Sequence, residues 1–298
     1  MAVQQDEPRI IGSLSPSRAG DFLSCALMYR FRTIDRLPEP SSPDAVRGTL
    51  VHKVLEDLFD LPAAERTPAA AHALLQPTWA TVREADPRAA TILDGLDEAA
   101  WLESASDALD RWFALEDPTR LEPAEREAAV ECLLDNGLML RGIIDRVDVA
   151  PDGSIRISDY KVAKSPAEGW EARALFQLRF YGLMLWRTRG VVPSVIRLIY
   201  LVDSQIVSYE PDEADLLATE RKVKAVWSAI SAARASGEFE PSPGKQCDWC
   251  AHHALCPVFG GTPPPLPVTS PPRRSRTPLT RWQRFRRKVR QLFSRSSG

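Results

Sequence analysis

The sequence predicts an α/β fold. Two observations support this: five runs of strand-forming residues lie between residues 126 and 210, and segments of helical periodicity precede, interrupt and follow them. With 298 residues, 44% of them hydrophobic, the chain suits one large domain or two modest ones. No apolar run reaches the length of a membrane span, and no secretory signal pattern opens the sequence. We therefore expect a cytoplasmic protein without a transmembrane segment.

Helical periodicity dominates the first 117 residues. One helix is expected within residues 14–37, with Ser15 or Ser17 as its N-cap, and a second within residues 44–61. Residues 63–117 are rich in alanine and charge, and prolines divide them into short helical stretches. This part is predicted to be a helical insert, at about residues 62–120, that covers one side of the fold.

The five predicted strands follow the insert. They cover residues 126–134, 138–150, 154–163, 194–202 and 205–210. A helix over residues 172–190 separates the third and fourth strands and ends at Gly190, and a long helix follows over residues 212–236. After Gly260, six prolines lie between positions 263 and 272, which is typical of a linker rather than of a core.

Charge is unevenly distributed along the chain. Residues 262–298 contain ten Lys or Arg and no Asp or Glu, so of the net charge of −2 this tail carries +10 and the first 261 residues carry −12. The acidic body argues against a wide nucleic-acid-coating surface and restricts such contact to a local basic groove. The tail is predicted to be disordered; contact with DNA and a helix for a partner or a membrane surface are the alternatives.

The second and third strands form a predicted hairpin that places two carboxylates opposite each other. Pro151, Asp152 and Gly153 supply turn chemistry, and a turn centred on Asp152 puts Asp145 opposite Asp159. Directly opposed side chains lie about 5 Å apart, where two like charges repel. Isoleucines precede both carboxylates on the same strand faces (Ile143 and Ile157), so both carboxylates are expected to point inward. A divalent cation would remove the repulsion, and oxygen ligands suit Mg²⁺ or Mn²⁺.

This hairpin, read as "GIIDRVD" followed by "DYK", resembles the core of the PD-(D/E)XK nuclease superfamily in its RecB-like branch. The resemblance extends over about residues 14–260 and includes three further features of that branch. A Gly-x-x-x-His pattern supplies His52, the strand before Asp145 supplies Glu131, and a Gln-x-x-x-Tyr pattern supplies Gln177 and Tyr181. The resemblance implies a restriction-endonuclease-like core, in which helices flank a central mixed sheet.

The resemblance also implies a role for each of these residues. His52, Asp145, Asp159 and the backbone carbonyl of Tyr160 are expected to hold Mg²⁺ or Mn²⁺. Lys161 is expected to position the attacking water or to stabilise developing negative charge. The remaining residues are expected to support the site: Glu131, with Glu127 as its rival, would orient the metal shell, and Gln177 and Tyr181 would position DNA or the site.

Cysteine spacing predicts a second metal centre. Cys247, Cys250 and Cys256 form a C-x2-C-x5-C pattern, which is typical of metal binding and needs a fourth ligand. Cys132 is interpreted as a small buried hydrophobic residue, and His252 or His253 is an alternative ligand. Four cysteines generally hold zinc. However, Cys25 together with the C-terminal pattern resembles the [4Fe–4S] staple of AddB-type and CRISPR-adaptation nucleases, which implies an iron–sulfur cluster.

The expected function is a metal-dependent deoxyribonuclease, acting as an exonuclease on single-stranded DNA or on free DNA ends. The chain lacks a G-x-x-x-x-G-K-[ST] pattern, so any helicase would be a separate partner. A catalytically silent nucleic-acid-binding or scaffold protein is the alternative, and RNA stays open as a substrate. The expected organisation is a nuclease domain over residues 1–261, with the iron–sulfur segment at about 245–260, followed by the tail over 262–298.

Overall fold

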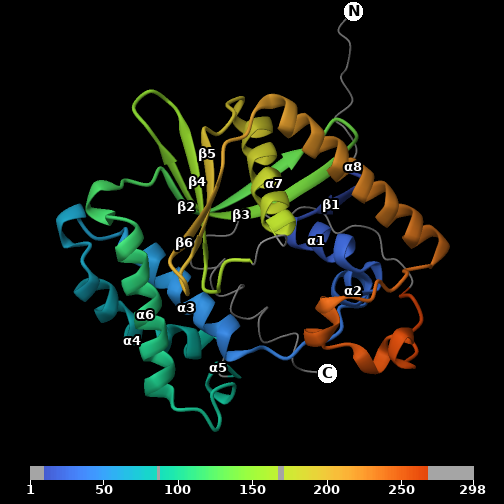
Figure 1. Ribbon diagram of the computed structural model, residues 1–298, viewed down its shortest axis with the longest axis horizontal. Helices are drawn as coiled ribbons and strands as arrows, with labels where there is room; N and C mark the ends of the chain where they lie inside the picture. The colour runs from blue at the N-terminus through green and yellow to red at the C-terminus, as the bar shows by residue number, and fades with distance from the viewer. Residues whose placement is uncertain (1–9, 86–87, 167–170, 268–298) are drawn as a thin grey trace, which may run out of the picture.

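A mixed sheet lies at the centre of the structure, a computed structural model that describes residues 10–85, 88–166 and 171–267 (Figure 1). Its six strands in the described part are β1 Gly12–Leu14, β2 Glu125–Leu133, β3 Leu138–Val149, β4 Ile155–Lys161, β5 Val195–Tyr200 and β6 Gln205–Tyr209. The main path is β1-β3-β4-β5-β6, and β2 pairs with β3 beside it. The β1–β3 and β4–β5 pairs are parallel and the others are antiparallel. All five predicted strands are present; β1, at three residues, was too short to predict.

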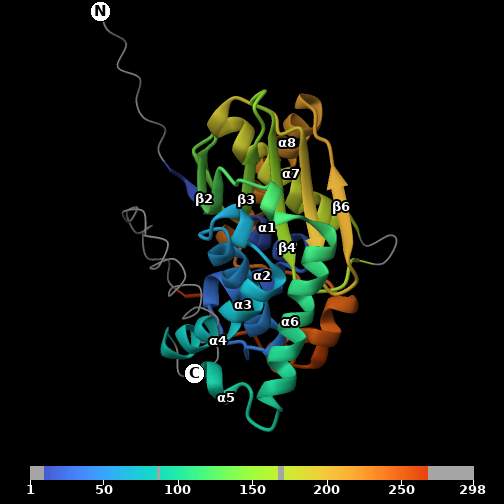
Figure 2. The same cartoon turned by 90° about the vertical axis from the view of Figure 1, so that its left-hand side faces the viewer.

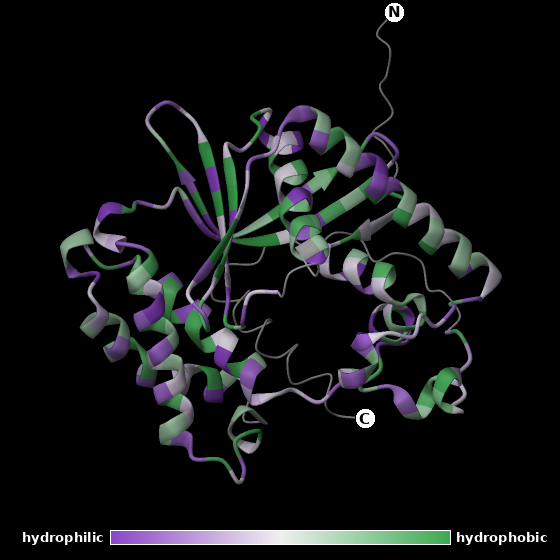
Figure 3. Cartoon of the chain, viewed as in Figure 1, coloured by the Kyte–Doolittle hydropathy of each residue, from purple (hydrophilic) through white to green (hydrophobic). Residues whose placement is uncertain are grey.

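Helices cover the two sides of this sheet (Figures 1 and 2). They are α1 Pro16–Ser24, α2 Ala26–Tyr29, α3 Pro43–Leu58, α4 Pro68–Ala85, α5 Arg88–Thr91, α6 Glu98–Leu115, α7 Glu171–Arg189 and α8 Glu213–Ser236. One core joins α7, α8 and the N-terminal segment to the sheet, through residues such as Ile157 and Leu198. A second core joins α3 and the α4–α6 group to the other face, through Tyr160, Ile199 and Leu201. Figure 3 shows how hydrophobic residues concentrate along the central strands.

The first predicted helix is interrupted at Cys25. This residue is extended (φ −162°), it ends α1, and its thiol accepts a hydrogen bond from the backbone N–H of Met28 in α2. The backbone then forms a π-helical turn over Arg30–Asp35 instead of continuing as an α-helix. The prediction of one helix over residues 14–37 is therefore wrong, because the chain is extended at Cys25. At this break the Cys25 thiol caps α2 and also accepts a hydrogen bond from the backbone N–H of Ser242 in the C-terminal segment.

The helices predicted around residues 62–120 are present as α4, α5 and α6. They pack against α3 through tryptophans that are almost fully buried, Trp79 and Trp112 among them. Pro77 lies inside α4 without ending it. Figures 1 and 2 show these helices grouped at one end of the sheet, whereas the segment after α8 (orange to red) lies beside α2.

The β3–β4 ladder ends where the two acidic residues begin. Its registered pairs run from Val149↔Ile155 to Arg146↔Ser158, the register predicted from the turn, and they stop before Asp145 and Asp159. Beyond this point β3 continues with β2, and β4 continues with β5. The two strands diverge here (Figure 1), so residues 159–161 no longer pair with β3.

The alternation of side chains along β3 also breaks at this point. Ile144 is fully buried, whereas Ile143 is 39% exposed. Arg146 and Val147 are adjacent and both fully or almost fully buried. The prediction placed Asp145 on a buried face that includes Ile143, and the exposure of Ile143 contradicts it. A local irregularity in the strand directs the Asp145 side chain instead.

Two glycines offer a test of this packing. A Cβ at Gly12 in β1 would lie 2.1 Å from the Cζ2 atom of Trp227, which is 8% exposed, whereas a Cβ at Gly48 in α3 would meet nothing within 4 Å. We expect Gly12→Ala to lower the free energy of unfolding by about 1–3 kcal/mol, because overpacking displaces the indole. Gly48→Ala is expected to raise it by about 0.5–1 kcal/mol, because Ala favours a helix.

Urea unfolding followed by circular dichroism measures both changes. Equal midpoints for the two variants would contradict the packing described for β1.

Candidate active site

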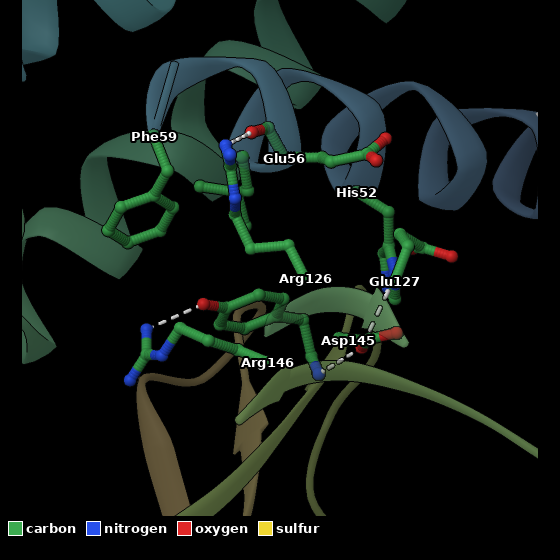
Figure 4. Close-up of a pocket in the computed structure, with 9 residues that line it drawn as sticks. His52, Glu56, Phe59, Arg126, Glu127, Asp145 and Arg146 are labelled. Atoms are coloured by element: carbon green, nitrogen blue, oxygen red, sulfur yellow. Dashed lines mark hydrogen bonds and ion pairs between the residues drawn. The ribbon is translucent and has the colours of Figure 1, made fainter. Parts of the chain in front are cut away.

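Three potential metal ligands meet near the end of the β3–β4 ladder (Figure 4). They are His52 from α3, Glu127 from β2 and Asp145 from β3, and one ligand atom of each lies within 4.8 Å of the other two. His52 Nδ1 lies 3.4 Å from Asp145 Oδ2 and 3.8 Å from Glu127 Oε1. Their side chains are 16%, 15% and 9% exposed for His52, Glu127 and Asp145. An imidazole and two carboxylates in this arrangement are suited to a divalent cation.

Local backbone geometry directs these side chains. α3 begins after its N-cap Ser42, and its buried face holds His52 above the sheet, with the imidazole edge-on to the ring of Tyr160. Glu127 has a φ of 44°, in the left-handed region that non-glycine residues rarely occupy. The flanking pairs Arg126↔Arg146 and Ala128↔Ile144 place it across from Asp145. Strain of this kind is concentrated at functional sites, which supports a role for the Glu127 carboxylate.

Asp159 and Lys161 lie beside this group. The Asp159 side chain is 4% exposed, and the Nζ atom of Lys161 lies 2.5 Å from Asp159 Oδ2. Gln177 on α7 donates hydrogen bonds to Asp159 Oδ1 and to the hydroxyl of Tyr181, each over 3.3 Å. The i, i+4 spacing places Gln177 and Tyr181 on one face of α7, and this face lies against Asp159.

Electrostatics at the site favour binding of a cation. Burial raises the pKa of Asp159 above its ordinary value, and the nearby Asp145 carboxylate adds to that rise while Lys161 opposes it. Burial alone would lower the pKa of Lys161, but the carboxylates of Asp159 and Asp145 outweigh it and raise the value, so the ammonium stays charged. The two carboxylates therefore repel each other through space, and a divalent cation would relieve this repulsion.

The structure gathers most of the predicted site residues but not Glu131. His52, Asp145, Asp159, Lys161, Gln177 and Tyr181 all lie around the end of the ladder, and the backbone N–H of Tyr160 donates to Asp145 Oδ2 over 2.7 Å. Glu131 is 57% exposed and pairs with Arg141 instead. It lies four residues, or about 13 Å, further along β2 than Glu127. Glu131 therefore lies outside the group of potential metal ligands, and its rival Glu127 lies inside it.

The sequence prediction also missed a buried ion-pair network behind the site. Arg146 follows Asp145 directly, and its guanidinium contacts Glu116, which immediately follows α6. The sequence contains a signal for this network, because a charged residue such as Arg146 on a buried strand requires a partner of opposite charge. The partner could not be identified from the sequence, since Glu116 lies 30 residues away.

The four predicted cysteine ligands line one cavity. Cys25, Cys247, Cys250 and Cys256 surround it together with apolar side chains such as Phe31 and Phe259. Cys132 lies elsewhere, on β2, with its side chain in the main core, where burial raises the pKa of its thiol to about 11. The two histidines of this segment have other partners: His252 Nε2 lies 2.9 Å from Glu39 Oε1, and His253 contacts the carbonyl oxygen of Cys247.

Comparison with known proteins places this arrangement in a family. A family model described as the PD-(D/E)XK nuclease superfamily matches residues 13–257, most of the chain. The chain belongs to the PD-(D/E)XK nuclease superfamily. Its mixed sheet flanked by helices is consistent with the restriction-endonuclease-like fold of this superfamily, which confirms the predicted fold class. In the described part of the chain, no helix is long and apolar enough to cross a membrane.

Individual relatives agree with this assignment. The Gene 69 protein of Mycobacterium phage D29 is 29% identical over 127 residues, which are 42% of this chain and 45% of that protein. An ATP-dependent helicase/deoxyribonuclease subunit of Streptococcus equi subsp. zooepidemicus is 29% identical over 161 residues, 50% of this chain and 14% of that relative. The chain thus spans less than half the length of either curated relative. A crystal structure of a putative exonuclease from Eubacterium rectale covers 80% of this chain and 87% of its own, with a TM-score of 0.53 and 16% identity, which shows a shared fold.

A pair of substitutions on β2 tests the metal site. Glu127→Gln removes a carboxylate from the three-residue group, whereas Glu131→Gln removes one that is exposed and pairs with Arg141. We expect Glu127→Gln to weaken Mn²⁺ binding at least about tenfold and Glu131→Gln to leave it within about twofold. Isothermal titration calorimetry measures both affinities. A larger loss in Glu131→Gln than in Glu127→Gln would exclude the arrangement described.

Proposed function

We propose that this nuclease is a Mg²⁺- or Mn²⁺-dependent deoxyribonuclease that acts as an exonuclease on single-stranded DNA or on free DNA ends. The observation that supports it best is the convergence of His52, Glu127 and Asp145 next to the Asp159–Lys161 pair. The residues present fit a divalent cation, because two like-charged carboxylates and an imidazole face one small space. A bound divalent cation would lower the pKa of a water ligand and would shield phosphate charge.

Each residue has a proposed role in this reaction. His52, Glu127, Asp145, Asp159 and the backbone carbonyl of Tyr160 would hold the cation, so Glu127 takes the place expected for Glu131. The Lys161 side chain is 30% exposed and keeps its charge, so its ammonium would orient the attacking water or stabilise negative charge on the phosphate. Gln177 and Tyr181 hold Asp159 in position through the hydrogen bonds from Gln177.

The shape of the site supports a single-stranded substrate. The ligand side chains of His52, Glu127 and Asp145 are at most 16% exposed, and α3 and the sheet enclose the pocket that they line. A flexible single strand or a frayed end reaches such recessed atoms more readily than the rigid surface of a duplex. The names of two relatives, one a deoxyribonuclease and the other a putative exonuclease, support DNA as the substrate and cleavage from an end. The helicase part of the first name supports a separate helicase as partner.

Lys161 gives the most direct test of catalysis, with the exposed Lys164 as its control. Lys161→Ala is expected to lower the rate of Mn²⁺-dependent cleavage at least about a hundredfold, because a charge aimed at the reacting phosphate is lost. It is expected to leave the fold and DNA binding largely intact. Lys164→Ala, three residues further along, is expected to stay within about twofold of the wild type.

The assay uses end-labelled single-stranded and double-stranded DNA, with RNA of the same sequence alongside. Protein that binds Mn²⁺ and DNA but cleaves none of these substrates would favour the silent scaffold instead. Full activity of Lys161→Ala would remove the proposed mechanism.

We further propose that the four cysteines hold a [4Fe–4S] cluster. All four line one cavity, which supports a shared metal centre. Four cysteines could hold zinc or a cluster, because ligand type alone does not choose between them. The resemblance of Cys25 and the C-terminal cysteine pattern to the iron–sulfur nucleases of this branch favours the cluster. Free cysteines as ligands also support the proposed cytoplasmic location.

Cys25 and Cys132 distinguish a metal ligand from a core residue. Protein purified without air is expected to be brown and to contain iron and sulfide in about equal amounts. Cys25→Ala should lose the colour and lower the melting temperature, because the staple joins α1 and α2 to the C-terminal segment. Cys132→Ala should keep the colour. A colourless wild type with one tightly bound zinc would exclude the cluster, and full metal content in Cys25→Ala would exclude Cys25 as a ligand.

We propose the predicted domain organisation as well. Residues 1–261 would form the nuclease domain, with the helical insert at about 62–120 and the iron–sulfur segment at about 245–260. The contact of Glu116 with Arg146 joins the insert to β3 of the sheet, which supports a single domain. Of the tail predicted over 262–298, residues 268–298 lie outside the described residues.

A further inference from the structure

A fully buried arginine lies directly behind the site. Arg146 is 1% exposed, so its guanidinium is removed from water and must be paired to remain stable in the folded protein. Its Nη1 and Nη2 atoms donate to the two carboxylate oxygens of Glu116 over 2.7 and 2.8 Å. Such a two-point pair fixes the plane of the guanidinium as well as its position.

Glu116 is itself held firmly. The indole N–H of Trp112 donates to Glu116 Oε2 over 3.0 Å, and Arg197 on β5 donates to Oε1 over 2.5 Å. Burial alone would raise the pKa of Glu116, but its hydrogen bonds and charge contacts with the two arginines lower the value, so the carboxylate stays charged. Arg146 is therefore attached to a rigid anchor formed by the end of α6 and by β5.

A further contact of Arg146 reaches the site. Its Nη1 atom donates to the hydroxyl of Tyr160 over 2.6 Å, and that residue is 4% exposed. At the other end of the same residue, the Tyr160 backbone N–H donates to Asp145 Oδ2 over 2.7 Å. Tyr160 thus connects Arg146 to the carboxylate of the preceding residue in β3.

The contacts of Tyr160 lie where the β3–β4 pairing ends. The β3–β4 pairs stop at Arg146↔Ser158, so no ladder pair with β3 holds residues 159–161. On the other side, these residues pair with β5. On the β3 side, Tyr160 attaches this segment through its contacts with Arg146 and Asp145. Tyr160 therefore connects the Asp159–Lys161 segment to β3 beyond the end of the ladder.

We propose that Arg146 is a positioning residue that holds Tyr160, and through Tyr160 the Asp159–Lys161 segment, in the geometry required for metal binding. This inference rests on the proposed function, because it assigns a task to the same metal site. It also gives the helical insert a task at the metal site, because Glu116, which follows α6, holds Arg146 in place. Outer residues that orient metal ligands typically change metal affinity or activity by about 10–100-fold when they are replaced.

Tyr160→Phe tests the proposal with a minimal change. It removes the hydroxyl that Arg146 contacts and keeps the ring and the backbone N–H. Mn²⁺ affinity, measured by titration calorimetry, is expected to fall about 10–100-fold, and kcat should fall with it while KM for DNA changes little. Arg146→Lys keeps the charge but cannot bridge Glu116 and Tyr160, so it should reproduce the loss.

Ser158→Ala is the matched control. The Ser158 hydroxyl also accepts a hydrogen bond from Arg146, over 3.3 Å, but its second donor is Arg197, so it lies on the Glu116 side of the network. Its loss is expected to lower the melting temperature by a few degrees, as in Tyr160→Phe, while Mn²⁺ affinity stays within about twofold. A purely structural network would lower stability in both variants and leave Mn²⁺ affinity unchanged in both.

Wild-type Mn²⁺ affinity in Tyr160→Phe would overturn the proposal, whether or not Arg146→Lys folds. Mn²⁺ binding is measured without cleavage, so a failure of the proposed function can be distinguished from a failure of the positioning role. A wild type that binds Mn²⁺ but cuts no DNA would overturn the proposed function alone. An active wild type with an unchanged Tyr160→Phe variant would overturn only the positioning role.

Discussion

The separation of β3 from β4 is the constraint on which the site depends. In a continued ladder, the next pair would place the Asp145 and Asp159 carboxylates directly against each other. The strands diverge instead, and each carboxylate finds different partners: His52 and Glu127 around Asp145, and Lys161 and Gln177 around Asp159. The divergence also frees backbone groups, one of which, the N–H of Tyr160, is satisfied by Asp145. The acidic site is therefore built from the same irregularity that ends the strand pairing.

Buried charges on both sides of the site are paired with opposite charges. On the α7 side, Asp159 is almost fully buried and its charge is compensated by Lys161, which is only partly exposed. On the insert side, Arg146 is compensated by Glu116 and by Asp148, the next even-numbered residue of β3. A buried charge without a partner would cost several kcal/mol, so the loss of Glu116 would destabilise the insert side. His52, Glu127 and Asp145 lie next to these two groups of charges, where their carboxylates would attract an added cation.

Much of the site could be predicted because its parts are local. The turn at Pro151–Gly153 fixed the register of β3 and β4, and the structure has that register. The i, i+4 pair of Gln177 and Tyr181 followed from helical geometry alone. Glu127 could not be chosen over Glu131 in this way, since both are odd-numbered residues of one strand and alternation gives them the same face. The left-handed backbone of Glu127 and its place across from Asp145 made the difference, and neither has a signal in the sequence. Partners such as Glu116 were equally inaccessible, because only the tertiary fold brings the end of α6 to β3.

The segment that contains α1 and α2 meets the cysteine-rich segment next to the connection that leads into α3. Glu39 lies in that connection, and both Arg32 from the N-terminal segment and His252 from the cysteine-rich segment contact its carboxylate. Burial alone would raise the pKa of Glu39, but hydrogen bonds from His252 and Arg32 lower it to about 2. Further contacts bind the same two segments, from Gln246 to the carbonyl oxygen of Ser24 and from Arg30 to that of Pro264. These contacts hold Cys25 near Cys247, Cys250 and Cys256, with which it lines one cavity. Glu39 precedes Ser42, the N-cap of the helix that carries His52, so one carboxylate joins the N-terminal and cysteine-rich segments close to that helix.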